Sequence, residues 1–180
     1  MTLQATTSLV TGATSGIGLE TARQLAGLGS RVLVHGRSQT SATAAAEDVL
    51  RHGDAEPVWG DLGSFAEVRD LARQVRDKTD SIDVLINNAG VFVPERKETP
   101  DGHETTFQVN HLSMQLLTVE LLPQVCAARA ARVLAVSSVA HFRGNVDFDD
   151  LEHLNDYSAM AAYQDDLNAQ AKAKNANLTR

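Results

Sequence analysis

Several features are scarce or missing in this 180-residue chain, and each excludes a class of protein. The one cysteine, Cys126, excludes an internal disulfide framework and has no Cys or His at metal-ligand spacing, so we expect a buried, inert thiol and no metal centre. No run of 18 apolar residues is present, and the start "MTLQATTSLVTG" lacks the basic and apolar regions of a signal peptide. We therefore expect a cytoplasmic protein without a membrane partner.

Positive charge is also scarce. The chain has 16 Lys and Arg residues against 23 Asp and Glu residues, a net charge of −7, and no local basic cluster. This balance opposes binding to a phosphate backbone, so no nucleic-acid partner is expected. Internal repeats and low-complexity linkers are absent as well, while 43% of the residues are hydrophobic. The sequence predicts one globular domain over residues 1–180.

Short β-branched runs alternate with longer segments of helical periodicity. Segment 64–78 shows the helical pattern, with apolar residues on one face and a capping-box pair, Ser64 and Glu67, at its start. Strands that are each followed by a helix form a parallel sheet covered on both faces. The sequence therefore predicts an α/β, doubly wound, Rossmann-type fold with strand order 3-2-1-4-5, and its strands are expected at residues 6–12, 31–36, 56–62, 83–90 and 132–138.

The stretch "VTGATSGIG", residues 10–18, joins the first expected strand to a helix. Gly12 suits a sharp turn, Gly16 lets the backbone approach a pyrophosphate, and Gly18 allows close packing of the helix. Thr14, Ser15 and Ile17 complete this loop, whose alternative interpretation is a tight connection without a ligand. Arg37 ends the second strand where an acid would bind a ribose hydroxyl, which favours NADP over NAD, although a solvated arginine is the alternative.

Several motifs in order resemble the short-chain dehydrogenase/reductase family, in its retinol-dehydrogenase-like branch. They are "TGATSGIG", "INNAG" at 86–90, "DGHETTFQVNHLSMQLLT" at 101–118, "SSVAHFRG" at 137–144 and "FDDL" at 148–151. The resemblance implies that Asp61 and Leu62 flank the adenine and that Arg37 meets the 2′-phosphate. It further implies a wall beside the adenine ribose, formed by Asn87, Asn88, Ala89 and Gly90.

The same resemblance implies a catalytic set of Ser138, Tyr163, Lys172 and Asn110, which interconverts a carbonyl and an alcohol on a small-molecule substrate. Hydride transfer to a carbonyl leaves an alkoxide, so a hydroxyl must polarise the oxygen and a phenol must supply a proton. In the family, a lysine four residues after the tyrosine lowers the phenol's pKa, because positions i and i+4 share one helix face.

This chain departs from that pattern, since position 167 is leucine and Lys172 lies nine residues after Tyr163. The C-terminal stretch "NAQAKAKNANLTR" instead places Asn168 at the tyrosine position, so a five-residue insertion after Tyr163 is the simplest explanation. A looped-out insertion allows Tyr163 and Lys172 to meet, whereas a helical one does not.

The resemblance also implies two further strands and a lid beyond Arg180. Without them the strand at 132–138 is an apolar edge, which predicts a homo- or hetero-oligomer. The alternative function is a catalytically impaired or non-redox truncated subunit that binds cofactor or a partner chain.

His141 is expected to be structural, and the acidic group at 147–152 is expected to be a solvated loop.

Overall fold

The computed structural model describes the backbone of residues 3–175 and the side chains of residues 3–167. Its centre is one parallel sheet in the order β3-β2-β1-β4-β5, which confirms the predicted fold class and strand order. The second strand has the predicted bounds, whereas the other four end earlier than the runs that predicted them, because those runs continue into loops at the edge of the sheet. The strands are β1 Thr7–Val10, β2 Arg31–Gly36, β3 Ala55–Trp59, β4 Val84–Asn87 and β5 Arg132–Ala135.

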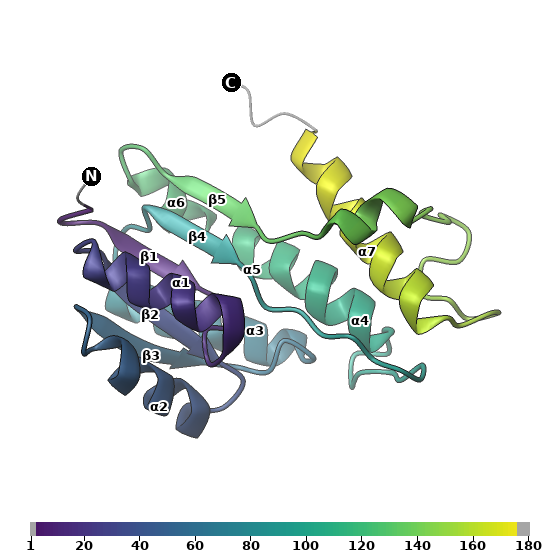
Figure 1. Ribbon diagram of the computed structural model, residues 1–180, viewed down its shortest axis with the longest axis horizontal. Helices are drawn as coiled ribbons and strands as arrows, with labels where there is room; N and C mark the ends of the chain where they lie inside the picture. Colours follow the sequence, from purple (N-terminus) through teal and green to yellow (C-terminus); the bar gives the residue numbers. More distant parts are fainter. Residues whose placement is uncertain (1–2, 176–180) are drawn as a thin grey trace.

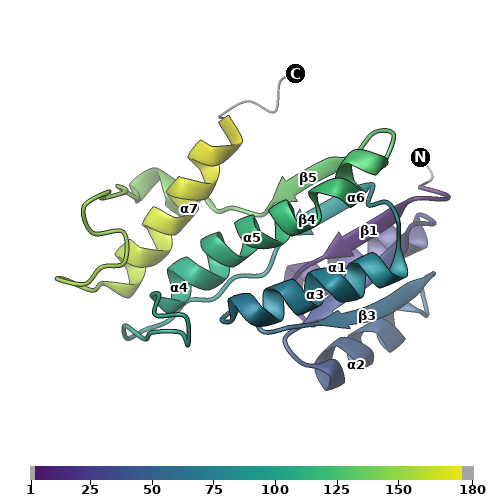
Figure 2. The same ribbon diagram turned by 180° about the vertical axis from the view of Figure 1, so that it is seen from behind.

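Helices cover the two faces of the sheet. Figure 1 shows α1 and α2 on one face, and Figure 2 shows α3, α5 and α6 on the other. A 3-10 turn, η2, and the last helix, α7, lie beyond the carboxyl ends of the strands (Figure 1). The bounds are α1 Gly16–Gly27, α2 Gln39–Val49, α3 Phe65–Lys78, α4 Thr105–Phe107, π-turn η1 Gln108–Leu112, α5 Ser113–Glu120, α6 Leu122–Ala127, η2 Val139–Arg143 and α7 Ala159–Asn175.

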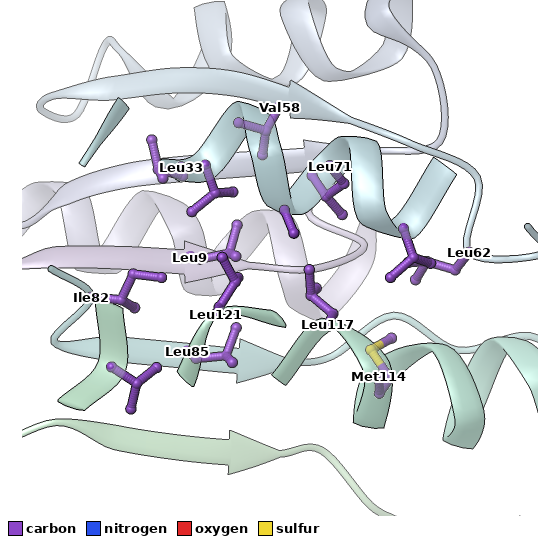
Figure 3. Close-up of a cluster of buried hydrophobic side chains, with 14 of the residues drawn as sticks. Leu9, Leu33, Val58, Leu62, Leu71, Ile82, Leu85, Met114, Leu117 and Leu121 are labelled. Atoms are coloured by element: carbon purple, nitrogen blue, oxygen red, sulfur yellow. The ribbon is translucent and has the colours of Figure 1, made fainter. Parts of the chain in front are cut away.

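The core follows the two-residue period of the strands. Leu33, Leu9 and Leu85 stand side by side in the register of β2, β1 and β4, and they pack against α3 and α5 through Leu71 and Leu117 (Figure 3). The alternate positions face α1 and α2, where alanines allow these helices to approach closely. Both faces are therefore apolar, as a covered parallel sheet requires.

The edge strand β5 is covered on one face only. Val133 continues the buried leucine row and packs on the core, whereas Leu134 pairs in register with Ile86 on the opposite face and is 48% exposed. Leu134 is exposed because α1 and α2, which cover this face, lie over the strands away from β5 (Figure 1). An exposed apolar edge was predicted from the sequence, and the described residues have one.

Two local predictions need correction. Cys126 is exposed, because α6 turns Val125 to the core and a helix rotates the next residue by about 100°. The capping box of α3 is only half formed: Ser64 Oγ accepts from the Glu67 amide at 3.4 Å, but the Glu67 carboxylate accepts from the Asp61 amide at 2.7 Å. The Glu67 side chain therefore binds the loop before α3 and not the backbone amide of Ser64, as a complete capping box would require.

Among the described residues, no helix combines the length and the apolar character that are needed to cross a bilayer.

One buried histidine joins three strand ends. His35, near the end of β2, is 2% exposed and bonds through its two ring nitrogens to Gly12, after β1, and to Gly60, after β3. Burial lowers its pKa below the ordinary value of 6.5. Burial also lowers the pKa of His111, the second histidine with this shift.

These shifts predict that acid destabilises the fold. A histidine that is neutral when folded but protonates when unfolded keeps its stabilising effect above about pH 6.5 and loses it as the pH falls toward the folded pKa. We expect the free energy of unfolding to fall below about pH 6.5, with a slope of up to ~1.4 kcal/mol per pH unit for each such histidine. Urea titrations between about pH 7 and 5 measure this slope.

His35→Asn removes one titrating group and should flatten that slope, whereas His52→Asn, at an exposed position after α2, should leave it unchanged. Equal slopes for the wild-type protein and His35→Asn would contradict the assignment.

Candidate functional site

A cavity of about 640 Å³ lies at the carboxyl ends of the strands. It brings together every predicted cofactor residue except Gly16 and Asn87, and these residues come from loops that are far apart in the sequence. Open α/β sheets bind their ligands at this edge, in the crevice where the strand order reverses, and here β1 lies between β2 and β4. The predicted residues in the lining are Gly12, Thr14, Ser15, Ile17, Gly18, Arg37, Asp61, Leu62, Asn88, Ala89 and Gly90.

The glycine turn is shaped by close approaches of the backbone. Gly12 has φ of +62°, and a Cβ there would lie 2.7 Å from the Cα of Ala89. A side chain at Gly18 would overlap the carbonyl oxygen of Gly12. Gly16 has φ of +55°, and a Cβ there would meet nothing within 4 Å, so this position faces open space. The turn therefore presses on the loop after β4 and leaves the start of α1 open to an anion.

A threonine that the sequence interpretation did not single out holds these loops together. Thr11 is fully buried, and its Oγ1 accepts hydrogen bonds from the amides of Asn88 at 2.9 Å and Ala89 at 3.0 Å. The Asn88 side chain donates to the carbonyl of Thr11 at 2.9 Å. A polar residue that ends an apolar strand needs buried partners, and that need was the available signal for Thr11.

Asn87 does not take part in the predicted wall. Its side chain is buried and donates from Nδ2 to Oγ1 of Thr118 at 3.0 Å, on the α5 side of the sheet. Successive side chains of a strand point to opposite faces, so only the residues after β4 turn toward the cavity. The prediction of a wall beginning at Asn87 is wrong for its side chain, whereas Asn88, Ala89 and Gly90 do line the cavity.

The loop after β3 forms the far end of the cavity. Asp61 closes this turn, because its Oδ1 accepts from the Gly63 amide at 2.8 Å. The Leu62 side chain is buried in the core, and its carbonyl accepts from Oγ of Ser113 at 2.5 Å. Arg37 is exposed at the rim. This end thus offers a guanidinium, a carboxylate and backbone groups to a ligand.

The cavity also contains residues that were not predicted. They come from the end of β2, from the loop after β3 and the start of α3, from the loop after β4, and from the segment that leads through α4 into η1. Loops at the carboxyl ends of parallel strands are expected to line such a site. Which residues of each loop reach the cavity depends on the path of the chain between β4 and α4. The additional lining residues are His35, Gly60, Gly63, Ser64, Glu67, Val91, Glu98, Thr99, Pro100, Thr105 and Val109.

Asn110 lies in the π-turn η1, between α4 and α5. Its Oδ1 accepts from the amide of Val91 at 2.7 Å, and its Nδ2 donates to the carbonyl of the same residue at 2.9 Å. Single π-turns inside helices occur frequently at functional sites. Here the turn aims a buried side chain at the strand-end loop after Gly90.

Ser138 ends the chain segment that leaves β5 and caps the turn η2. Its Oγ accepts from the amide of Ala140 at 3.2 Å, and Nδ1 of His141 donates to its carbonyl at 2.6 Å. A hydroxyl has one hydrogen and two lone pairs, so the capped Ser138 can still donate to a substrate oxygen. His141 fixes the backbone of this turn, which agrees with the structural role expected for it.

Tyr163 lies on α7, and its ring meets the ring of Phe92 edge to face, with 5.8 Å between centroids. The chain after η2 is fastened to the same helix, because the Asn145 amide donates to Oδ1 of Asp165 at 2.5 Å. Gly144 touches the backbone of Gln164 so closely that a side chain would overlap it. Asn110, Ser138 and Tyr163 are thus carried by neighbouring segments beyond β4 and β5.

The lysine position one helical turn after Tyr163 is occupied by Leu167, which is 5% exposed. Helix α7 continues unbroken to Asn175, so the apparent insertion is helical rather than looped out. The side chains of Asn168 and Lys172 lie outside the described residues. The unbroken helix argues against the predicted pairing of Lys172 with Tyr163, because that pairing required the insertion to loop out.

The acidic group at 147–152 organises loops. The Asp150 carboxylate accepts from the amides of Leu154 and Asn155, and the bond from Leu154 is the main reason for its lowered pKa. Glu152 bonds to Nδ1 of His103 at 2.6 Å. Within the part of the chain that the structure describes, no three His, Cys, Asp or Glu residues are arranged to hold a metal ion.

The chain is similar to known proteins along most of its length. Residues 6–159 match the family model described as short chain dehydrogenase. Human retinol dehydrogenase 13 is 38% identical over 168 residues, which cover 90% of this chain and 50% of that protein. Mouse polyprenol dehydrogenase is 40% identical over 163 residues, which cover 87% of this chain and 49% of that protein. The chain thus spans about half the length of the curated relatives that it matches.

Solved structures show the same likeness. An uncharacterized protein from Mycobacterium paratuberculosis superimposes with a TM-score of 0.81 at 34% identity, over 97% of this chain and 65% of that one. The RhlG/NADP active-site complex of Pseudomonas aeruginosa gives a TM-score of 0.78 at 28% identity, over 96% of this chain and 65% of that one. With the glycine turn, the strand order and the family match in agreement, the chain belongs to the short-chain dehydrogenase family.

Proposed function

We propose that the protein is an NADP(H)-dependent oxidoreductase that interconverts a carbonyl and an alcohol on a small molecule. The observation that carries this proposal is the cavity, which joins the open glycine turn, Arg37 and the loop after β4 in one site. Membership of the family supports the reaction class. The chain covers about half the length of these relatives, so its activity as an oxidoreductase is a proposal.

The residues of the cavity fit a phosphorylated dinucleotide. The start of α1 presents amides without helical acceptors beside the open position at Gly16, which is a suitable place for a pyrophosphate. Arg37 lies at the opposite rim and follows Gly36 directly, so the end of β2 has no carboxylate that would repel a 2′-phosphate. A bound nicotinamide would supply or accept the hydride.

The proton chemistry is assigned to side chains of this protein. The Ser138 hydroxyl donates a hydrogen bond to the substrate oxygen, and the Tyr163 hydroxyl supplies the proton during reduction. Asn110 holds the Val91 segment in place through its two hydrogen bonds. Since Leu167 replaces the expected ammonium one turn away, we propose that proton transfer is slower than the family pattern allows.

The surroundings of this group favour an apolar substrate. Val139 and Phe142 in η2 are 81% and 79% exposed, and η2 packs on the helix that carries Tyr163. Phe92, which contacts the Tyr163 ring, is half exposed. Clusters of exposed apolar side chains commonly mark binding sites. The names of the relatives, retinol and polyprenol dehydrogenases, point to substrates of the same character.

Arg37→Ala tests the choice of cofactor. We expect the wild-type protein to bind NADPH more tightly than NADH, and the variant to lose ~1.5 to 3 kcal/mol of binding free energy toward NADPH, the range for a hydrogen bond to a charged group. Binding of NADH should change little, because NADH has no 2′-phosphate. Calorimetry with both cofactors measures this difference, and equal affinities in the wild-type protein would reject NADP.

Leu167→Lys tests the proton donor, because it places an ammonium one helical turn from Tyr163. An ammonium at this distance favours the ionised form of a phenol, so we expect kcat for retinal reduction with NADPH to rise by about 10²-fold, the lower end of general acid–base effects. Leu167→Met is the matched control, since methionine keeps the apolar packing of this buried position.

The gain should disappear in the double variant Leu167→Lys with Tyr163→Phe. A lysine variant that folds, binds NADPH and is no faster than the methionine variant would contradict the role of Tyr163.

We propose that the protein forms an oligomer through exposed apolar residues. Leu134 on β5 and Val119 and Leu122 on the α5 and α6 side are all about half exposed, and we expect one of these surfaces to be an interface. Light scattering should give a mass above the 19.3 kDa of one chain. Leu134→Lys should shift the mass toward the monomer, whereas Leu50→Lys, at an exposed leucine after α2, should not. A monomeric wild-type protein at micromolar concentration would refute the proposal.

A further inference from the structure

His35 makes contacts that the dinucleotide-binding pattern does not require. It lines the cavity although it is almost completely buried. Its Nδ1 lies 3.0 Å from the amide nitrogen of Gly12, and its Nε2 lies 3.0 Å from the carbonyl oxygen of Gly60. One imidazole ring therefore spans the space between the turn after β1 and the loop after β3.

These partners fix the protonation state of the ring. A backbone amide can only donate, so Nδ1 must accept from Gly12, and a carbonyl can only accept, so Nε2 must carry the hydrogen that Gly60 receives. His35 is thus held as the neutral Nε2–H tautomer. Burial favours this neutral form by lowering the pKa, and Asp61, the charged group that acts on the ring, opposes the shift. Asp61 belongs to the same loop as Gly60.

The backbone of His35 strengthens the link to the turn. Its carbonyl accepts from the amide of Ala13 at 2.9 Å, so two consecutive amides of the glycine turn bond to this one residue. The amides of Gly12 and Ala13 therefore donate within the protein and do not point at a pyrophosphate. An anion in the turn must rely on the later amides, around the open position at Gly16 and the start of α1.

The other end of the bridge is equally constrained. The Gly60 carbonyl accepts from His35, and the Gly60 amide donates to the carbonyl of Gly36 at 3.2 Å. Gly60 is followed by Asp61 and Leu62, which are assigned to the adenine. The end of β2 thus sets the position of that loop relative to the glycine turn, through the His35 ring and through the backbone carbonyls of His35 and Gly36.

We infer that His35 is a positioning residue of the dinucleotide site: it fixes the spacing between the pyrophosphate-binding turn and the adenine-binding loop, and it thereby strengthens cofactor binding. This inference rests on the proposed NADPH function. It assigns to His35 a role in binding rather than in hydride or proton transfer. Its loss should therefore change the Kd and KM for NADPH and leave kcat nearly unchanged.

The two bonds can be tested separately, because an Asn amide places its oxygen near the position of Nδ1, whereas a Gln amide reaches the position of Nε2. His35→Asn can keep the bond from Gly12, and His35→Gln can keep the bond to Gly60. His35→Leu fills the space without either bond. A neutral hydrogen bond contributes about 2- to 10-fold to an equilibrium constant, so loss of both predicts a weakening of about 4- to 100-fold.

NADPH fluorescence titrations of the four proteins measure this effect, with His52→Gln as a control on an exposed histidine. Support consists of a leucine variant at least ~4-fold weaker than wild type, at unchanged kcat, with Asn or Gln recovering part of the affinity. A leucine variant that binds as tightly as wild type would overturn the inference. So would Asn and Gln variants that both bind as weakly as leucine.

The tautomer gives a readout that needs neither cofactor nor variant. Long-range ¹H–¹⁵N correlation spectra of the wild-type protein at neutral pH should show His35 with a hydrogen on Nε2 and a bare Nδ1. An Nδ1–H tautomer or a doubly protonated ring would overturn the inference. If the wild-type protein binds neither NADPH nor NADH while the spectrum shows the expected tautomer, the proposed function fails and the described bridge stands as a purely structural one.

Discussion

The structure depends on how the backbone amides are satisfied where the central strands end. At the carboxyl ends of β1 and β4 the ladder stops, and the chain must turn while it is still buried. Thr11 solves this problem by accepting from two consecutive amides after β4, while the Asn88 side chain returns a bond to the carbonyl of Thr11. Buried amides without partners are costly, so these bonds fix the two loops against each other.

The glycines of the turn follow from this close approach. With the loop after β4 held at Thr11, Gly12 lies so near Ala89 that a side chain would have no room. Gly16, by contrast, has empty space beside it, which is where an anion can approach the start of α1. The two positions look alike in the motif but differ in their physical reason. At Gly12 both the positive φ and the contact with Ala89 exclude a side chain, whereas at Gly16 only the positive φ does so and the neighbouring space is open.

The residues that we propose for proton transfer are held by different means. Asn110 reaches the loop after β4 from a π-turn, and the chain after Ser138 is fastened to α7 near Gln164. The Tyr163 ring packs edge to face on Phe92, which lies in the loop that Asn110 binds through two hydrogen bonds. At the next helical turn, however, the buried position belongs to Leu167. The scaffold that positions this group is present, while the charge that would assist proton transfer is not at its usual place.

The sequence by itself determined the parallel sheet, the strand order and half of the residues around the cavity, because strand and helix periods, the glycine turn and the family motifs are local patterns. It did not identify the roles of Thr11 and His35, since a polar residue at the end of an apolar strand indicates only that buried partners are needed, and these partners come from loops up to 78 positions away. The tertiary structure also decided that Asn87 faces α5 and that Cys126 faces solvent, because burial depends on what packs against a residue.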